Sequence, residues 1–150
     1  MERRAQRRRF KSNQVADVLS SGELLELARA ARQRAYAPYS RFEVGAALLT
    51  QDGRTFTGCN VENASYGLSM CAERNAVFAA VSAGVRTFVA IAIAGAPGAA
   101  CLPCGACRQV LAEFNPALAV TYSDAASATT RSLSELLPAP FLPENLKAPS

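Results

Sequence analysis

The sequence predicts an α/β fold, a three-layer α/β/α sandwich with a mixed central sheet. Helical and extended patterns alternate along the 150 residues in the order α-β-β-α-β-α-β-α, which is typical of layered α/β domains. Residues 87–94 form an apolar run of the kind found in strands that are buried on both faces. A composition of 50% hydrophobic and 19% charged residues fits one globular domain of this length.

The first half of the chain predicts a helix followed by a β-hairpin. Ser20 and Glu23 have the spacing of a capping box, and apolar residues at helical spacing extend the helix over residues 20–36. Strands are expected over residues 44–50 and 55–60, because a turn sequence that contains Asp-Gly separates them.

The second half alternates helices and strands. The expected elements are a helix over 70–83, a strand over 87–94, a helix over 104–114, a strand over 118–122 and a short helix over 132–137. Gly84 ends the first of these helices, and Ser132 with Glu135 forms a second capping box. Beyond residue 138 the chain is rich in proline.

Charge divides the chain into two parts. The first eleven residues hold six basic groups and one acidic group, which leaves 10 basic and 11 acidic groups in the remainder. We expect a basic, flexible tail over residues 1–19 and a single domain over residues 20–150. The nearly neutral body offers no basic stripe that could follow a phosphate backbone, so a polynucleotide is not the expected substrate.

The sequence favours a cytoplasmic protein with no membrane segment. No apolar stretch follows the basic start, as a signal peptide would require, and glycines and a proline interrupt the longest apolar stretch, residues 88–102. Five cysteines without an export signal fit a reducing compartment, where clustered thiols are more often metal ligands than disulfides.

The chain contains no histidine, which excludes Ser-His-Asp triads, Cys-His dyads and the zinc sites that need an imidazole. Cys104 and Cys107 are three residues apart on an expected helix, so their sulfurs share one face. Cys71 supplies a third thiol from another helix start. Three ligands with one open position are typical of catalytic zinc. Glu73 can then move a proton, and Arg74 can balance the negative charge.

Two other metal centres remain open on spacing alone. Cys101, Cys104 and Cys107 also match part of a bacterial iron–sulfur pattern, with Cys71 as a distant fourth ligand. A closed structural zinc site that uses Cys101 would supply all four ligands of the metal and would leave no position for water. Neither alternative gives Glu73 a role.

Cys-x-Glu followed by Pro-Cys-x-x-Cys is the pattern of zinc nucleobase deaminases. The chain resembles the cytidine deaminase family from about residue 37 to residue 146, and specifically its short form with three cysteine ligands. The matching blocks are PYSRFEVGAAL (38–48), GCNVENASYGL (58–68), CAER (71–74) and PCGACRQVLAEF (103–114).

This resemblance implies hydrolytic deamination of cytidine and deoxycytidine to uridine and deoxyuridine with release of ammonia, a reaction of pyrimidine salvage. It implies one Zn²⁺ ion per chain, held by Cys71, Cys104 and Cys107. Glu73 would carry protons to the ring nitrogen and to the departing amine.

The resemblance also assigns substrate contacts. Asn60 and Glu62 would hold the sugar hydroxyls, and Phe42 would pack against the nucleoside. The backbone of Ala72 would read the base edge, and the match of the second block adds Tyr66 to the substrate-binding set.

Short members of the family are homotetramers with sites at subunit interfaces, so the resemblance implies the same assembly here. An aromatic residue near the C-terminus belongs to the shared lining, and Phe141 is the candidate. Residues 138–143 depart from the family pattern, because they lack the glycines expected around this phenylalanine.

Two other functions are consistent with the same residues. A deaminase of a cytosine-bearing antibiotic would keep zinc and Glu73 but would bind another group in place of the sugar. The pair Asn60 and Glu62 favours ribose. A nucleic-acid-binding zinc protein that uses the arginine-rich tail would be independent of Glu73 and strongly dependent on salt.

Overall fold

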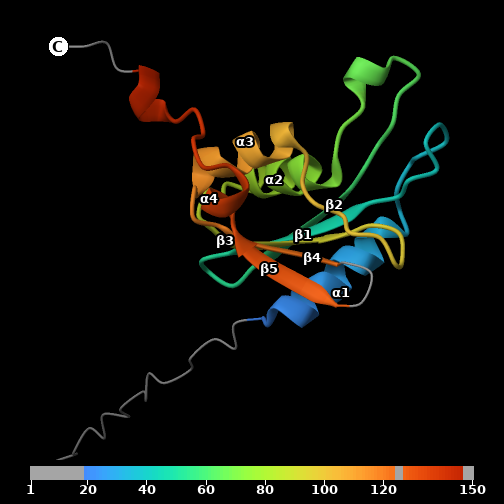
Figure 1. Ribbon diagram of the computed structural model, residues 1–150, viewed down its shortest axis with the longest axis horizontal. Coiled ribbons are helices and arrows are strands. Elements are labelled where there is room, and N and C mark those ends of the chain that lie inside the picture. The colour runs from blue at the N-terminus through green and yellow to red at the C-terminus, as the bar shows by residue number, and fades with distance from the viewer. Residues whose placement is uncertain (1–18, 124–126, 147–150) are drawn as a thin grey trace, which may run out of the picture.

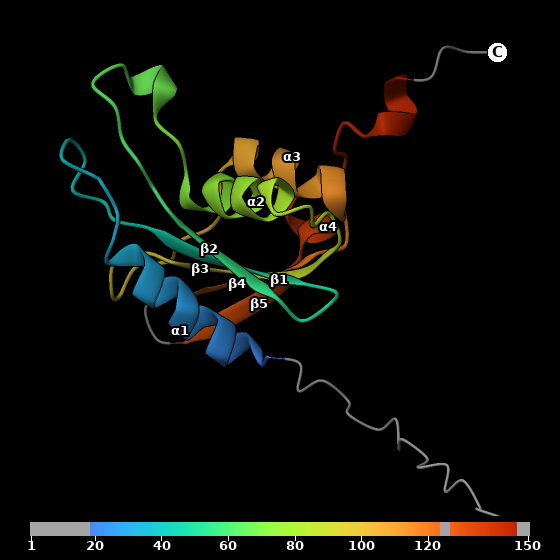
Figure 2. The ribbon, with the colours of Figure 1, turned by 180° about the vertical axis from the view of Figure 1, so that it is seen from behind.

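The computed structural model describes residues 19–123 and 127–146, and it confirms the three-layer α/β/α sandwich. Helix α1 covers one face of the central sheet, and α2, α3 and α4 cover the other (Figures 1 and 2). Of the expected basic tail, residues 1–18 lie outside the described residues. No helix within the described ranges is both long enough and apolar enough to cross a membrane.

The sheet is mixed, as expected. Its strand order is β2-β1-β3-β4-β5, with β3 and β4 parallel and the other neighbours antiparallel. The strands are β1 (Gly45–Thr50), β2 (Thr55–Cys59), β3 (Phe88–Ala94), β4 (Ala119–Ser123) and β5 (Ala128–Ser132). The helices are α1 (Ser21–Arg32), α2 (Ala72–Ser82), α3 (Gly105–Phe114) and α4 (Leu133–Leu136), with short 3₁₀ helices η1 (Tyr66–Leu68) and η2 (Pro143–Leu146).

Strand β1 is buried on both faces, and its alternating side chains build two cores. Ala46 and Leu48 belong to the core beneath α2 and α3, whereas Ala47 and Leu49 pack with α1. Because successive side chains of a strand point to opposite faces, one apolar strand serves both layers. The helix starts that carry the cysteines are thereby fixed against the sheet.

Helix α1 begins at the predicted capping box but ends four residues earlier than expected. The Ser20 side chain accepts a hydrogen bond from the backbone N–H of Glu23, and the Glu23 carboxylate accepts one from Ser20. The chain leaves the helix because Tyr36 bonds instead to the segment after β2. Its N–H donates to the Asn60 carbonyl at 3.0 Å, and its carbonyl accepts from the N–H of Glu62 at 2.8 Å.

The edge strand β5 is absent from the sequence expectation. Ala128–Ser132 is polar and largely exposed, so it lacks the apolar alternation that marks a half-buried strand. It pairs with β4 through the backbone, and the hydroxyls of Thr121 and Thr130 lie 2.9 Å apart. The capping box of Ser132 and Glu135 is confirmed, although it starts a helix of only one turn.

Gly58 lets β2 approach the start of α2, and its replacement by alanine is expected to destabilise the fold. A Cβ atom there would lie 2.4 Å from the Ala72 carbonyl oxygen and 2.5 Å from the Ala76 nitrogen. Because backbone atoms cannot move aside easily, Gly58→Ala should lower the free energy of unfolding by about 1–3 kcal/mol. Denaturant unfolding measures this, with Gly67→Ala as control because no atom lies within 4 Å of its added Cβ. Equal stability of the two variants would contradict the prediction.

Candidate active site

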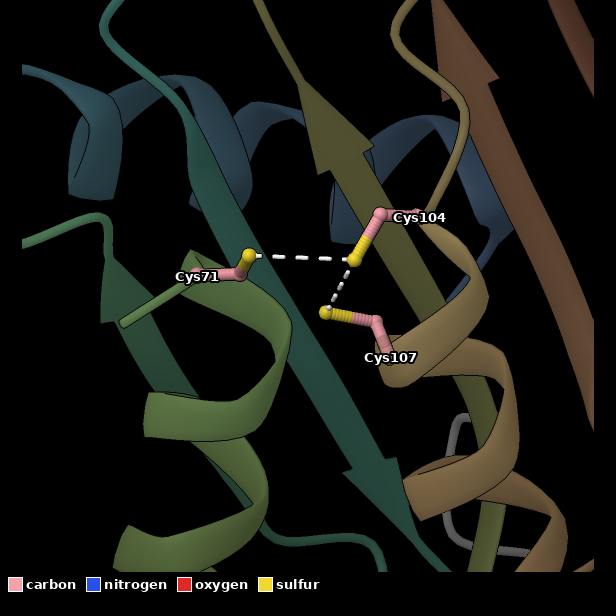
Figure 3. Close-up of side chains that lie close together, drawn as sticks. All are labelled: Cys71, Cys104 and Cys107. Carbon is pink, nitrogen blue, oxygen red and sulfur yellow. Dashed lines mark hydrogen bonds between the residues drawn. The ribbon is translucent and has the colours of Figure 1, made fainter. Parts of the chain in front are cut away.

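Three cysteine sulfurs meet where the starts of α2 and α3 lie side by side. Cys71 is the N-cap of α2, Cys104 is the N-cap of α3, and Cys107 lies in the first turn of α3. The Sγ atoms of Cys71 and Cys104 are 3.8 Å apart and those of Cys104 and Cys107 are 3.5 Å apart (Figure 3). All three sulfurs lie within 4.8 Å of one another.

This cluster has the dimensions of a zinc site. Sulfurs placed tetrahedrally at about 2.3 Å from zinc are about 3.8 Å apart, close to the separations found here. Within the described ranges, Cys101 is not part of the group that could hold a metal. The closed four-cysteine centre and the iron–sulfur arrangement that use Cys101 therefore have no counterpart in this cluster. A tetrahedral zinc ion held by these three sulfurs would have a fourth position for water.

Positive charge surrounds the thiols. The N-termini of α2 and α3 carry partial positive charge, which stabilises thiolates. Nη2 of Arg74 donates a hydrogen bond to the Cys71 sulfur at 3.3 Å, as expected for a counter-charge. Hydrogen bonding from Cys107, reinforced by Arg74, lowers the pKa of Cys71 to about 5. The pKa of Cys107 is raised, because its thiol hydrogen-bonds to Cys71 and is buried.

Glu73 lies in the first turn of α2, two residues after Cys71, and only 4% of its surface is exposed. Burial raises the pKa of its carboxyl group, since the charged form loses solvation, and the nearby Cys71 charge adds to this effect. A raised pKa suits a carboxyl group that has to donate a proton as well as accept one.

A cavity of about 300 Å³ opens beside the thiols. Its lining consists of Ser40, Phe42, Val44, Asn60, Glu62, Cys71, Ala72, Glu73, Cys101, Leu102 and Cys104. Two of the three clustered cysteines and the buried Glu73 therefore line the same cavity. Four of the six predicted substrate contacts line it as well, namely Phe42, Asn60, Glu62 and Ala72. A larger hollow of about 660 Å³ near α1 has arginines in its lining but none of these groups. Chemistry, not size, identifies the candidate site.

Asn60 and Glu62 face this cavity, and both also fix the loop that carries Phe42. The Asn60 amide accepts a hydrogen bond from the N–H of Val44 at 2.8 Å and donates one to the Phe42 carbonyl at 2.8 Å. The Glu62 carboxylate accepts from the N–H groups of Tyr39 and Ser40 and from the Ser40 hydroxyl. The hydrogen bond from Ser40 is the main cause of a lowered pKa at Glu62.

Two predicted contacts lie outside the cavity. Tyr66 is 75% exposed on the arm, defined as residues 60–71 between β2 and α2, and its ring lies 5.9 Å from that of Tyr39. Phe141 is 58% exposed, and the Gln109 side chain holds its backbone by hydrogen bonds of 2.6 Å and 3.1 Å. Neither side chain reaches the thiols of its own chain through this cavity.

Sequence reasoning missed four residues of the cavity lining, namely Ser40, Val44, Cys101 and Leu102. Ser40 and Val44 flank Phe42 within a matching block, so that block was the available signal. Cys101 and Leu102 directly precede Pro103 and Cys104. Burial raises the pKa of the Cys101 thiol to about 11, which keeps it neutral.

The sequence matches a family model described as the cytidine and deoxycytidylate deaminase zinc-binding region over residues 20–123. That span covers the β1–β2 hairpin, the arm and the three clustered cysteines. The chain belongs to this deaminase family. Membership together with the three-thiol cluster supports one zinc ion per chain.

Named members of this deaminase family are similar over most of the chain. A cytidine deaminase of Halalkalibacterium halodurans is 50% identical over 125 residues, which is 82% of this chain and 95% of the relative. One from Sporosarcina psychrophila is 45% identical over 126 residues, 83% of this chain and 93% of the relative.

Solved structures agree with the fold. The crystal structure of a cytidine deaminase from Burkholderia pseudomallei has a TM-score of 0.78 and 51% identity, covering 82% of this chain and all of that one. A cytidine deaminase from Mycobacterium tuberculosis gives a TM-score of 0.74 and 44% identity, over 82% of this chain and 98% of that one.

Proposed function

We propose that the protein is a zinc-dependent cytidine deaminase that hydrolyses cytidine and deoxycytidine to uridine and deoxyuridine with release of ammonia. One observation carries this proposal: a buried carboxylate and two thiols of the three-cysteine cluster line a cavity whose other side chains suit a nucleoside. The similar proteins named above, which are cytidine deaminases by name, support it.

Cys71, Cys104 and Cys107 are the proposed zinc ligands. Zinc bound there would lower the pKa of a water in its fourth position to about 7. The protein contributes two helix N-termini and the Arg74 guanidinium, which offset the negative charge of three thiolates. Without this compensation, three thiolates would leave the metal a weak acid.

Glu73 is the proposed proton carrier. Its carboxylate takes a proton from the attacking water and delivers it to the ring nitrogen beside the amine-bearing carbon. A second transfer through Glu73 moves the proton of the added hydroxyl to the amine, so that the carbon–nitrogen bond breaks, ammonia leaves and the carbonyl of uridine forms. Because Glu73 is nearly inaccessible to solvent, the proton stays within the site between the two transfers.

The other lining residues have proposed roles in binding. The Phe42 ring packs against the nucleoside, the Ala72 backbone binds the base edge, and Asn60 with Glu62 binds the sugar hydroxyls. Asn60 and Glu62 favour a ribose or deoxyribose substrate. An antibiotic-type substrate would present another group to them in place of the sugar.

We also propose a homotetramer with sites at subunit interfaces. Tyr66 and Phe141 support this, because both are largely exposed and outside the cavity of their own chain. In such an assembly they would contribute to a neighbouring subunit's site. Sedimentation equilibrium tests the proposal: four chains per particle are expected, and a monomer at micromolar concentration would contradict it.

The proposed setting is pyrimidine salvage in the cytoplasm, with residues 20–150 as the catalytic domain and residues 1–19 dispensable for chemistry. A chain that begins at residue 20 is expected to turn over cytidine at the rate of the full chain. Loss of turnover on this deletion would contradict the division into tail and domain.

The proposed activity is tested by following cytidine absorbance with purified protein and identifying the products. Uridine and ammonia are expected in equal amounts, and deoxycytidine should give deoxyuridine. Failure with both nucleosides by a protein that contains zinc would overturn the substrate assignment. Turnover of a cytosine-bearing antibiotic alone would favour the other deaminase.

A further inference from the structure

The loop over residues 39–44 carries Phe42 along the cavity, and side chains from the segment after β2 contribute five of its hydrogen bonds. Arg41 within it has φ of 58°, a left-handed conformation that is unfavourable for a residue with a side chain. Such a loop keeps one shape only when surrounding contacts hold it. The contacts of Asn60, described above, fix its last part, from Phe42 to Val44.

The Ser40 hydroxyl connects the Glu62 carboxylate to the part of the loop that contains Phe42. It donates to Oε1 of Glu62, and it accepts a hydrogen bond from the N–H of Phe42 at 3.0 Å. The N–H groups of Tyr39 and Ser40 donate to the other oxygen, Oε2, at 2.9 Å and 3.2 Å. One hydroxyl therefore links the Glu62 carboxylate to the Phe42 backbone.

Glu62 retains capacity for a ligand. A carboxylate offers about four acceptor positions, and the loop occupies three of them. Because Ser40 and the two N–H groups fix the plane of the carboxylate, the remaining acceptor position on Oε1 has a defined direction, and the carboxylate belongs to a residue that lines the cavity. Such preorganisation raises affinity, since less conformational entropy is lost on binding.

We propose that Ser40 is a positioning residue for the nucleoside: its hydroxyl orients Glu62 and Phe42 so that the sugar and the base are bound by a preformed wall. This inference rests on the proposed function, because it assigns the work of Ser40 to the same cavity. Ser40 acts through these two residues and takes no part in proton transfer.

The test is steady-state kinetics of Ser40→Ala with cytidine. The KM is expected to rise about tenfold while kcat stays within about twofold, because binding is weakened and Glu73 is unchanged. Ser40→Thr keeps a hydroxyl and should restore KM to within about threefold of the original. Ser65→Ala is the matched control, because that serine lies on the neighbouring arm and its side chain makes no capping hydrogen bond. Its KM should not change.

A double-mutant cycle separates positioning from a merely structural effect. Glu62→Gln alone should raise KM, and the double variant should raise KM by clearly less than the product of the two single effects. Zinc content and the unfolding temperature of Ser40→Ala should equal those of the control. The inference is overturned if KM is unchanged, if the two effects multiply, or if zinc or stability is lost together with activity.

The original protein is assayed first. If it does not turn over cytidine, the proposed function fails and the inference falls with it. If it turns over cytidine and Ser40→Ala behaves like the Ser65 control, the inference alone fails.

Discussion

Glu73→Gln is expected to keep its zinc and to lose at least about three orders of magnitude in kcat. The amide has nearly the shape of the carboxylate but cannot accept the proton, and general acid–base groups contribute about 10²–10⁴-fold to rates. The effect should lie at the upper end, because the buried site offers no histidine as a substitute. Stopped-time assays by chromatography can detect the residual turnover.

Glu113→Gln is the matched control for this substitution, because Glu113 is an exposed acid on α3. It should retain both zinc and kcat. Near-normal turnover by Glu73→Gln would remove Glu73 from the mechanism. Loss of zinc from that variant would instead assign the residue a role in holding the metal site together.

Cys104→Ala is expected to lower zinc affinity by more than about 100-fold, so that the purified variant contains little metal. Removing even a residue that supports a ligand costs about 10–100-fold, and removing a ligand costs more. The fold should survive, because Cys104 is exposed and its truncation leaves no buried cavity. Elemental analysis and competition with a chromophoric chelator provide the measurement.

Cys101→Ala is the control for Cys104→Ala, because it removes a cysteine near the site that is not an expected zinc ligand. Cys101 lines the same cavity but lies outside the three-thiol group, so this variant should keep a full complement of zinc. Full zinc content in Cys104→Ala would defeat the ligand assignment. Loss of zinc from Cys101→Ala would reinstate the four-cysteine centre.

Local signals in the sequence predicted most elements of the fold and the helix positions of the three clustered cysteines. Both capping boxes are formed, and the apolar run that predicted a doubly buried strand is β3 at the centre of the sheet. Cys71 and Cys104 begin their helices as expected, because each lies directly before a helical segment. Spacing along a helix is a local property, so it can be predicted without tertiary structure.

Features that depend on distant partners could not be predicted in this way. Strand β5 forms through pairing with β4, and its own residues carry no apolar pattern. The hydrogen bonds that join Asn60 and Glu62 to the loop around Phe42 cross 16 to 23 residues of chain. Nor could the chain's pattern reveal that Tyr66 and Phe141 are exposed and outside the cavity lining, because exposure is decided by packing.

The measurement that tests the central claim most directly is activity as a function of zinc content. Metal is removed with a chelator, zinc is restored in steps, and cytidine turnover and bound zinc are determined on the same samples. Turnover should vanish without metal and return in proportion to zinc, reaching its maximum at one ion per chain. Full turnover by the metal-free protein, or an iron centre in the purified chain, would contradict the account.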